Sequence, residues 1–208
     1  MSSVDYDYML RYVVNKNAYY NLCSLQSGGK KKENYYVLHS TNMENLLDIL
    51  KTGKVLANKY IDPQKRRMSG DTETKYVFAN LIQRKYMDVP NFGMGLIFDK
   101  KILRSEHFLF NPSWYAAPYE KSIEFFPDDP KFNSKFNSKF NSKMKKVFDL
   151  ITSPYPHKHE LLFEDSIDLK YLIGIHCPIC TLEQLNEIRK IVGYQIPIYF
   201  THNIPILE

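Results

Sequence analysis

The hydrophobic pattern is most regular between residues 35 and 55. The run YYVLHS, rich in aromatic and apolar residues, is typical of a buried strand. An amphipathic helix is expected next, because apolar residues recur at helical spacing at Met43, Leu46, Leu47 and Leu50. Thr41 and Glu44 have the spacing of a capping box at its start, and Gly53 is placed to end the helix as a left-handed cap.

Shorter apolar runs continue the pattern toward the middle of the chain. Strands are expected near Val55, at 75–81 and at 93–103, and the second of these is expected to run into a helix that includes Tyr86. Between the first two strands lies a basic, polar loop at 62–74. This loop is either a solvated turn or a contact for pyrophosphate or nucleic acid.

The C-terminal third alternates strands with one helix. Residues 159–177 contain two strand-like runs around a turn at Asp165 and Ser166. A helix is predicted for 181–192, with a capping box formed by Thr181 and Gln184. A last strand at 194–200 contains a proline and is therefore expected at a sheet edge or bulge. Short strands interrupted by two modest helices predict an α+β domain rather than a doubly wound sheet.

Two segments fall outside this regular pattern. Residues 1–34 end in SGGKKKEN, which is typical of a mobile, solvated loop, so the folded domain is expected to span 35–208. A flexible insertion is predicted at 128–146, where the four-residue unit FNSK occurs three times. A repeat of four fits neither the helical period nor the strand period. We therefore expect a disordered or weakly helical surface loop; the alternative is a segment whose Lys and Phe contact nucleic acid.

Composition narrows the class of protein. A net charge of +5 is mildly basic and compatible with phosphate-bearing ligands. Three cysteines argue against a disulfide framework and for a reducing compartment. No signal peptide and no apolar run of about 20 residues are visible, so an intracellular protein, cytoplasmic or nuclear, without a membrane partner is expected. Abundant Lys, Asn, Ile and Tyr are typical of an AT-rich genome, such as that of a large DNA virus or a parasite.

Three motifs, taken together, resemble the ADP-ribosyltransferases of the His-Tyr-Glu class, which includes the poly(ADP-ribose) polymerases. They are VLHST with His39, KYVFANL with Tyr76, and HELLFEDSIDLKYLIGI with Glu160. The last match is the longest, and the order and separation of all three agree. The resemblance implies an ADP-ribosyltransferase-like split β-sheet core, with two small packed sheets and flanking helices, that binds NAD as a co-substrate.

The resemblance also implies roles for individual residues. Glu160 would stabilise the electron-poor ribosyl group as nicotinamide leaves, and could assist an acceptor. His39 would hydrogen-bond the other ribose, and Tyr76 would stack on the nicotinamide ring. The backbone of Ser40 would pair with the carboxamide. Thr41 belongs to the same cofactor-binding set, although helix capping already accounts for its hydroxyl.

Further candidates complete the set of cofactor-binding residues. Tyr86 would be a second stacking ring, one position early relative to the family pattern, and Arg67 of the basic loop would meet pyrophosphate. Glu164 is a rival to Glu160, because alternation places both on one face of a strand. Ser40 stands where the family usually has glycine, which narrows the approach of the nicotinamide amide.

The expected activity is transfer of single ADP-ribose units from NAD to a macromolecular acceptor, protein or nucleic acid, with release of nicotinamide. The alternative is a non-catalytic module of the same fold that binds NAD or ADP-ribose. A third possibility, RNA 2′-phosphotransferase chemistry, is disfavoured by the carboxylate at Glu160. The motif from His176 to Cys180 resembles half a zinc site or a redox pair, but plain structural cysteines are the preferred interpretation.

Overall fold

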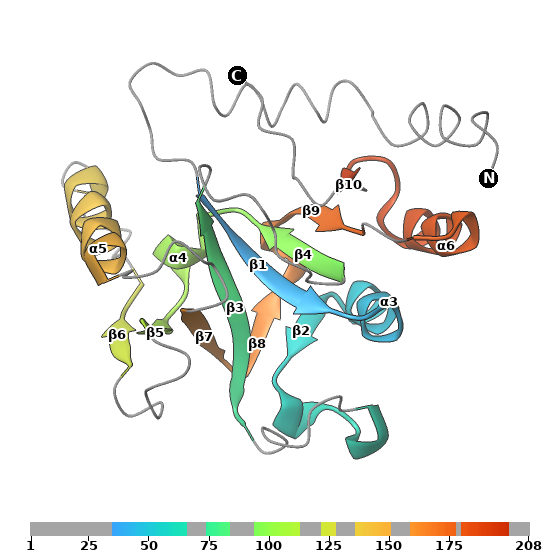
Figure 1. Ribbon diagram of the computed structural model, residues 1–208, viewed down its shortest axis with the longest axis horizontal. Coiled ribbons are helices and arrows are strands. Elements are labelled where there is room, and N and C mark those ends of the chain that lie inside the picture. The colour runs from blue at the N-terminus through green and yellow to red at the C-terminus, as the bar shows by residue number, and fades with distance from the viewer. Residues whose placement is uncertain are drawn as a thin grey trace.

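The structure, a computed structural model, is built around one large β-sheet with helices at its two ends (Figure 1). It describes residues 35–65, 74–83, 94–112, 122–127, 136–150, 159–177 and 180–199. The expected N-terminal loop, Arg67 of the basic loop and Tyr86 with its expected helix lie outside the described residues.

The large sheet contains eight strands in the order β10-β9-β4-β1-β3-β7-β5-β6. Their bounds are β1 Tyr35–Thr41, β3 Tyr76–Gln83, β4 Met94–Phe98, β5 Phe108–Asn111, β6 Ile123–Phe125, β7 Glu160–Glu164, β9 Leu172–His176 and β10 Ile198–Tyr199. All neighbours are antiparallel except β9 and β10, which are parallel. A second sheet pairs β2 (Lys54–Leu56) with β8 (Ser166–Asp168). The α+β class expected from the sequence is confirmed.

Four α-helices lie in the described residues: α3 Met43–Thr52, α4 Ile102–Ser105, α5 Phe136–Leu150 and α6 Leu182–Val192. Short 3-10 turns occur at Asn58–Tyr60, Pro63–Lys65 and Leu169–Tyr171. Leu46 of α3 and Ile188 of α6 are buried in the same hydrophobic core, and the two helices lie side by side (Figure 1). The helical spacing read from the sequence therefore marks the faces that pack against the sheet.

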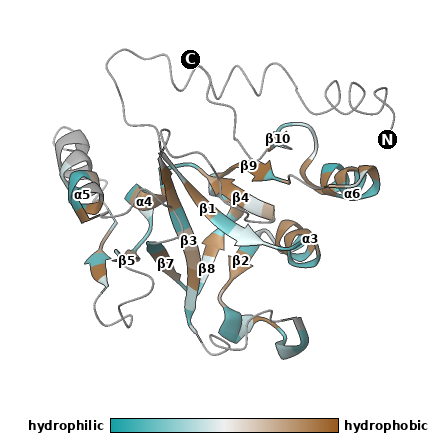
Figure 2. Cartoon of the chain, in the orientation of Figure 1, coloured by the Kyte–Doolittle hydropathy of each residue, from teal (hydrophilic) through white to brown (hydrophobic). Residues whose placement is uncertain are grey.

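Both faces of the central strands are apolar (Figure 2). On one face Val37, Val77 and Leu161 join the main core, together with side chains from the helices. On the opposite face Leu38 and Ile82 belong to a second, smaller buried cluster. A strand buried on both faces has no polar alternation, which explains why YYVL and YVFANLI are nearly continuous hydrophobic runs.

The start of α3 differs from the expected capping box. The N-cap is Asn42, whose side-chain Oδ1 accepts a hydrogen bond of 2.7 Å from the backbone N–H of Asn45. Thr41 is instead the last residue of β1, where it pairs with Met94 of β4. Asparagine is at least as good an N-cap as threonine, so the pairing of β1 with β4 decides which residue caps the helix. The Thr41 hydroxyl is therefore not used for capping.

Other local predictions are confirmed. Gly53 ends α3 in the left-handed conformation with φ of 76°. Thr181 and Gln184 form the expected capping box of α6. The last strand, β10, lies at the edge of the large sheet, as the neighbouring Pro197 predicted. Each of these features depends on a few residues close together in the sequence.

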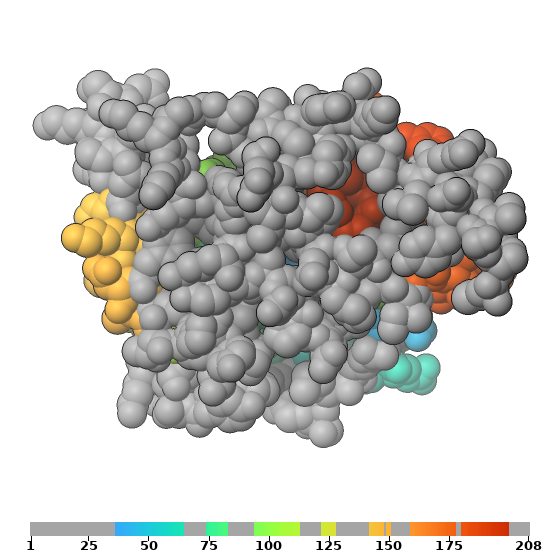
Figure 3. Space-filling view, turned by 45° about the horizontal axis from the view of Figure 1, so that its top comes forward, coloured from blue at the N-terminus to red at the C-terminus, as the bar shows by residue number. Residues whose placement is uncertain are grey.

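The described part of the FNSK repeat, which was expected to be a disordered or weakly helical loop, is helical: residues 136–150 form α5, a helix of 15 residues. The coloured atoms of α5, which lie toward its C-terminal end, are at one edge of the molecule (Figure 3). Met144 and Val147 of α5 are buried in the main core. The ammonium of Lys143 donates to the backbone carbonyls of Leu103 and Phe126 at 2.7 and 2.8 Å. Contacts made by the last residue of the repeat and by residues just after it thus hold the helix in place. The earlier residues of the expected insertion, 128–135, lie outside the described residues.

The segment after Glu160 makes three strands rather than two. The turn at Asp165 is present, with a positive φ of 63°. Beyond it β8 leaves the large sheet to pair with β2, and only β9 returns to the large sheet. Tyr60 and Lys59 hold this turn through Asp165, at 2.8 and 3.0 Å.

Candidate functional site

The three motifs read from the sequence lie on three neighbouring strands. In the large sheet β1 carries His39, β3 carries Tyr76 and β7 carries Glu160, and these strands are adjacent in the order β1-β3-β7 (Figure 1). More than a hundred residues of chain separate the first motif from the last. Their adjacency is a consequence of the topology and could not be read from the spacing of the motifs.

His39 is held by the strand beside it. Its Nδ1 lies 2.8 Å from the backbone carbonyl of Phe78 in β3. A carbonyl only accepts, so Nδ1 carries the hydrogen and Nε2 is the acceptor of the neutral ring. Burial lowers the pKa of His39 below its ordinary value of 6.5, and the hydrogen bond to Phe78 only partly offsets this. The imidazole is therefore neutral at pH 7 and can accept a hydrogen bond from a hydroxyl group.

The position of His39 coincides with a change of partner along β1. Pairing of β1 with β3 is recorded as far as Leu38, opposite Asn80, whereas pairing with β4 continues to Thr41. His39 thus lies where β1 parts from β3, and its ring reaches across to the edge of β3. Strand alternation points His39 to the face of Val37, opposite to the face of Leu38.

Glu160 begins β7 and is half-buried. It lies directly opposite Asn111 of β5, and the register of β3 with β7 brings Asn80 beside it on the other side. Its rival Glu164 is exposed and forms an ion pair of 2.6 Å with Lys75. The two carboxylates of β7 therefore occupy different environments, one between strands and one at the surface.

Tyr76 shares a face with Glu160 but lies farther along the strands. It pairs with Glu164, four residues from Glu160, which corresponds to about 13 Å along β7. The ammonium of Lys75 lies 5.2 Å from the centre of the Tyr76 ring. Between Tyr76 and the level of Glu160 lies the side chain of Phe78, on the same face. The structure brings the three strands together, but alternation directs Tyr76 and Glu160 to the face of Leu38 and His39 to the opposite face, that of Val37.

Ser40 and Thr41 follow His39 at the end of β1. Ser40 pairs with Gly95 of β4, and its Oγ is buried without a hydrogen-bond partner among the described residues. A Cβ at Gly95 would lie 2.6 Å from Cδ1 of the Leu38 side chain, which would have to shift, and 3.4 Å from the carbonyl oxygen of His39. Glycine therefore allows β4 to lie close to β1 at this point.

Sequence reasoning overlooked three residues beside these positions. Phe78 supplies the carbonyl for His39, and Asn80 and Asn111 flank Glu160. One signal was visible: the run FLFN of β5 ends on a polar residue just as VLH does in β1. The signal that marks His39, a polar residue at the end of a buried apolar run, therefore marks Asn111 as well.

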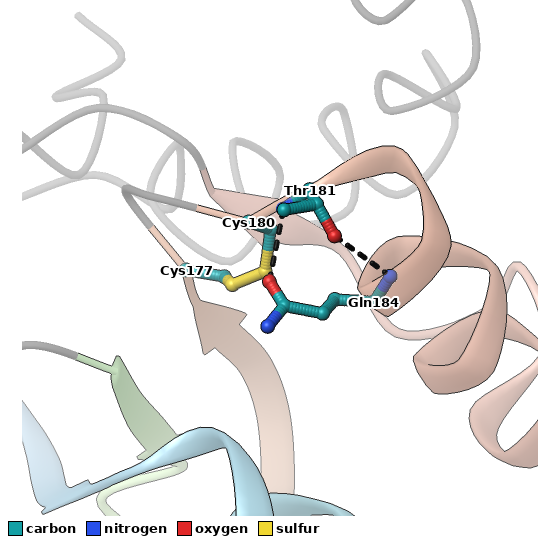
Figure 4. The surroundings of a disulfide bond; sticks show 4 residues. All are labelled: Cys177, Cys180, Thr181 and Gln184. Carbon is teal, nitrogen blue, oxygen red and sulfur yellow. Dashed lines mark hydrogen bonds between the residues drawn. A yellow bond between two sulfur atoms is a disulfide. The ribbon is translucent and has the colours of Figure 1, made fainter.

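Cys177 and Cys180 are joined by a disulfide bond between the end of β9 and the start of α6 (Figure 4). The sequence argued against a disulfide framework and favoured plain structural cysteines; the structure instead has one local disulfide, between two cysteines three positions apart. A disulfide cannot supply thiolate ligands, so the half zinc site is not one here. In the part of the chain that the structure describes, no group of three or more His, Cys, Asp or Glu side chains could hold a metal ion.

Comparison with solved structures gives distant likenesses of fold. Thermus sp. 2.9 DarT in complex with carba-NAD+ matches with a TM-score of 0.48 and 12% identity, covering 80% of this chain and 95% of that chain. The same protein in complex with ADP-ribosylated ssDNA also gives 0.48 and 12%, covering 80% and 94%. Thermosipho africanus DarTG in complex with ADP-ribose gives 0.43 and 14%, covering 81% and 49%.

Comparison of sequences gives a nearer relative and a family. Uncharacterized protein R11 of Acanthamoeba polyphaga mimivirus is 28% identical over 222 residues, covering 97% of this chain and 80% of that protein. No helix among the described residues is long and apolar enough to cross a membrane. A family model described as "Family of unknown function (DUF5846)" matches residues 32–152, more than half of the chain, and the chain belongs to this family.

Proposed function

We propose that this chain transfers single ADP-ribose units from NAD to a macromolecular acceptor, with release of nicotinamide. One observation carries the proposal: the strands that bear His39, Tyr76 and Glu160 are consecutive neighbours in the sheet. Motifs that merely resembled a family by chance would have no reason to fold onto adjacent strands in this way.

Glu160 is the residue assigned to the chemistry. When the bond between nicotinamide and ribose breaks, positive charge develops on the sugar, and a fixed carboxylate beside it lowers the energy of that state. The same carboxylate can hydrogen-bond a ribose hydroxyl or help to deprotonate the acceptor. A half-buried position between two strands suits this role better than the exposed, ion-paired position of Glu164.

His39 and Tyr76 are assigned to binding rather than to bond breaking. The neutral imidazole of His39 accepts from a ribose hydroxyl through Nε2, and the ring of Tyr76 stacks on a planar base. His39 and Glu160 lie on the strands that flank β3, about 10 Å apart at the usual strand spacing, and alternation directs their side chains to opposite faces of the sheet. The three residues therefore form no compact triad, and a dinucleotide that contacts both His39 and Glu160 has to pass the point where β1 parts from β3.

The remaining cofactor contacts belong to the same proposal. The backbone of Ser40 pairs with the carboxamide, and the Thr41 hydroxyl, which does not cap α3, is available to the ligand. Tyr86 and Arg67 keep their proposed roles as a second stacking ring and a pyrophosphate contact. The net charge of +5 favours a nucleic acid over a protein as acceptor.

Release of nicotinamide from NAD tests the proposal directly. Glu160→Gln removes the charge with little change of shape and is expected to slow release at least 100-fold, a loss of about 3 kcal/mol in transition-state stabilisation. Glu164→Gln is the matched control, because it changes the other carboxylate of the same strand and face, and should leave the rate within about threefold. Equal effects of the two substitutions would contradict the assignment.

The acceptor is identified in the same assay. Labelled NAD is incubated with the chain and either single-stranded DNA, RNA or protein, and the product is digested with nuclease or protease. Label that becomes soluble only with nuclease identifies a nucleic-acid acceptor.

The alternative is a module that binds NAD without transferring ADP-ribose. Ser40 favours this alternative, because its side chain narrows the approach of the nicotinamide carboxamide. Tight NAD binding by calorimetry, with no nicotinamide released over hours, would establish this alternative and overturn catalysis.

A further inference from the structure

The residue opposite Glu160 is a buried carboxamide. Asn111 is only 1% exposed, although it closes the strand Phe108–Asn111, whose other residues are apolar. In the described part of the chain only two other polar or charged residues are equally classed as buried, His159 and His176. A buried amide is tolerated only where its donors and acceptors have polar partners, so the surroundings of Asn111 have to include polar groups.

The register defines what Asn111 faces. Asn111 and Glu160 are direct partners of the antiparallel pair β5 and β7, and side chains at such positions point to the same face. Directly opposed residues have Cβ atoms about 4.5–5.5 Å apart. At this separation the carboxamide of Asn111 and the carboxylate of Glu160 can reach hydrogen-bonding distance. A carboxamide offers two N–H donors and an ionised carboxylate only accepts, so the two groups are complementary.

The asparagine on the other side of Glu160 is engaged differently. The side-chain Nδ2 of Asn80 donates to the backbone carbonyl of His159 at 2.8 Å. This contact fixes the backbone where the chain enters β7. Asn80 therefore anchors the strand itself, and Asn111 remains the neighbour suited to act on the carboxylate.

We propose that Asn111 is a positioning residue that donates a hydrogen bond to the Glu160 carboxylate and holds it ionised and oriented toward the ribose. The catalytic role of this hydrogen bond rests on the proposed function, whereas the hydrogen bond itself is inferred from the register of β5 and β7 alone. A donor to the charged form favours that form, so Glu160 stays ionised even though it is half-buried. A fixed carboxylate also needs no reorganisation when charge develops on the sugar.

Three variants separate this role from a general effect on the sheet. Asn111→Leu keeps the branching at Cγ and removes both donors. Asn111→Asp places a second carboxylate opposite the first. Leu109→Ala is the matched control, because Leu109 lies on the same strand and face but opposite Leu162. It weakens packing without changing the surroundings of Glu160.

Titration of Glu160 by NMR is the deciding experiment. Glutamate labelled with ¹³C at the carboxyl is followed against pH, and the signal that disappears in Glu160→Gln is assigned to Glu160. The pKa of Glu160 is expected to rise by about one unit in Asn111→Leu and further in Asn111→Asp, where like charges oppose ionisation. It should not move in Leu109→Ala. An unchanged pKa in Asn111→Leu overturns the proposal, and Asn111→Ala, which removes the same donors, decides if Asn111→Leu does not fold.

Kinetics with NAD supply the second readout. Asn111→Leu is expected to lower kcat about tenfold or more, because a hydrogen bond to a charged group is lost, with a smaller effect on KM. In Asn111→Asp the acidic limb of the pH profile should move to higher pH. A wild-type chain that releases no nicotinamide would overturn the proposed function. The titration needs no turnover, so it would still decide whether Asn111 acts on the Glu160 carboxylate.

Discussion

His39 shows how one side chain is set by its neighbours. Its ring is half-buried where β1 parts from β3, and its recorded partner is the backbone carbonyl of Phe78. Burial lowers its pKa, so the folded chain favours the neutral form. A neutral imidazole anchored through Nδ1 has a defined acceptor, which is what recognition of a ribose hydroxyl requires.

The lowered pKa predicts a dependence of stability on pH. In the unfolded chain His39 takes up a proton near its ordinary pKa of about 6.5, whereas in the folded chain it resists protonation until a lower pH. Between these two pKa values the unfolded state binds more protons than the folded state. The stability that neutral His39 contributes above about pH 6.5 is therefore lost as the pH falls from the unfolded pKa to the lower, folded pKa. Urea unfolding between pH 8 and pH 5 measures this loss.

The comparison is with His39→Gln, which cannot titrate. The free energy of unfolding of the wild-type chain should fall more steeply with decreasing pH than that of the variant. Parallel curves for the two chains would show that His39 is not held neutral.

At the next scale, α3 shows how an element begins where a strand releases the chain. Thr41 still pairs with Met94, so the first residue free to cap the helix is Asn42. The sequence pattern suited either residue, because both are good N-caps. The choice was made by pairing with β4, whose first residue, Met94, lies 53 residues after Thr41, and no local pattern contains that information.

Two substitutions test this assignment. Asn42→Ala is expected to lower the free energy of unfolding by about 1 kcal/mol, because the N–H of Asn45 loses its acceptor. Thr41→Val keeps the β-branched shape and should change it by less than about 0.5 kcal/mol. Thermal unfolding of both variants gives the two values, and the reverse order would restore Thr41 as the cap.

The helix α5 shows why the FNSK repeat does not reveal a helix by its hydrophobic pattern. A unit of four residues advances 400° around a helix with 3.6 residues per turn, so identical side chains drift by about 40° per unit and define no single face. The buried face is supplied by Met144 and Val147, which follow the repeat and are three residues apart. Helical spacing is present in the sequence, but only in the residues that follow the FNSK repeat.

On the scale of the whole molecule, the disulfide links the sheet to its flanking helices. Cys177 directly follows β9 and is buried in the core, and Cys180 directly precedes Thr181, the N-cap of α6 (Figure 4). Because α6 packs on α3, the bond ties one end of the large sheet to this pair of helices.

Reduction of this bond should destabilise the chain modestly. Closing a loop of only four residues stabilises a fold by about 2 kcal/mol on the chain-entropy model, and reduction should lower the free energy of unfolding by about that amount. Alkylation of the denatured chain followed by mass spectrometry provides the check on the bond itself. One cysteine, Cys23, should react before reduction and all three afterwards; three reactive cysteines from the outset would contradict the pairing.

The sequence by itself determined the features that depend on nearby residues. The left-handed cap at Gly53, the capping box at Thr181 and the edge position of β10 were all predicted, because each arises from conformational preferences or hydrogen bonds within a few residues. The α+β class followed from the same local patterns. For these features the tertiary structure added bounds and little else.

Only the tertiary structure decided which distant residues meet. The strand order β1-β3-β7, the different surroundings of Glu160 and Glu164, and the position of Asn111 opposite Glu160 all depend on pairing between segments far apart in the chain. Such pairing is selected by burial of the whole sheet, and a shift of one residue would reverse the face of every side chain. The register of the sheet, rather than any motif, therefore assembles the candidate site.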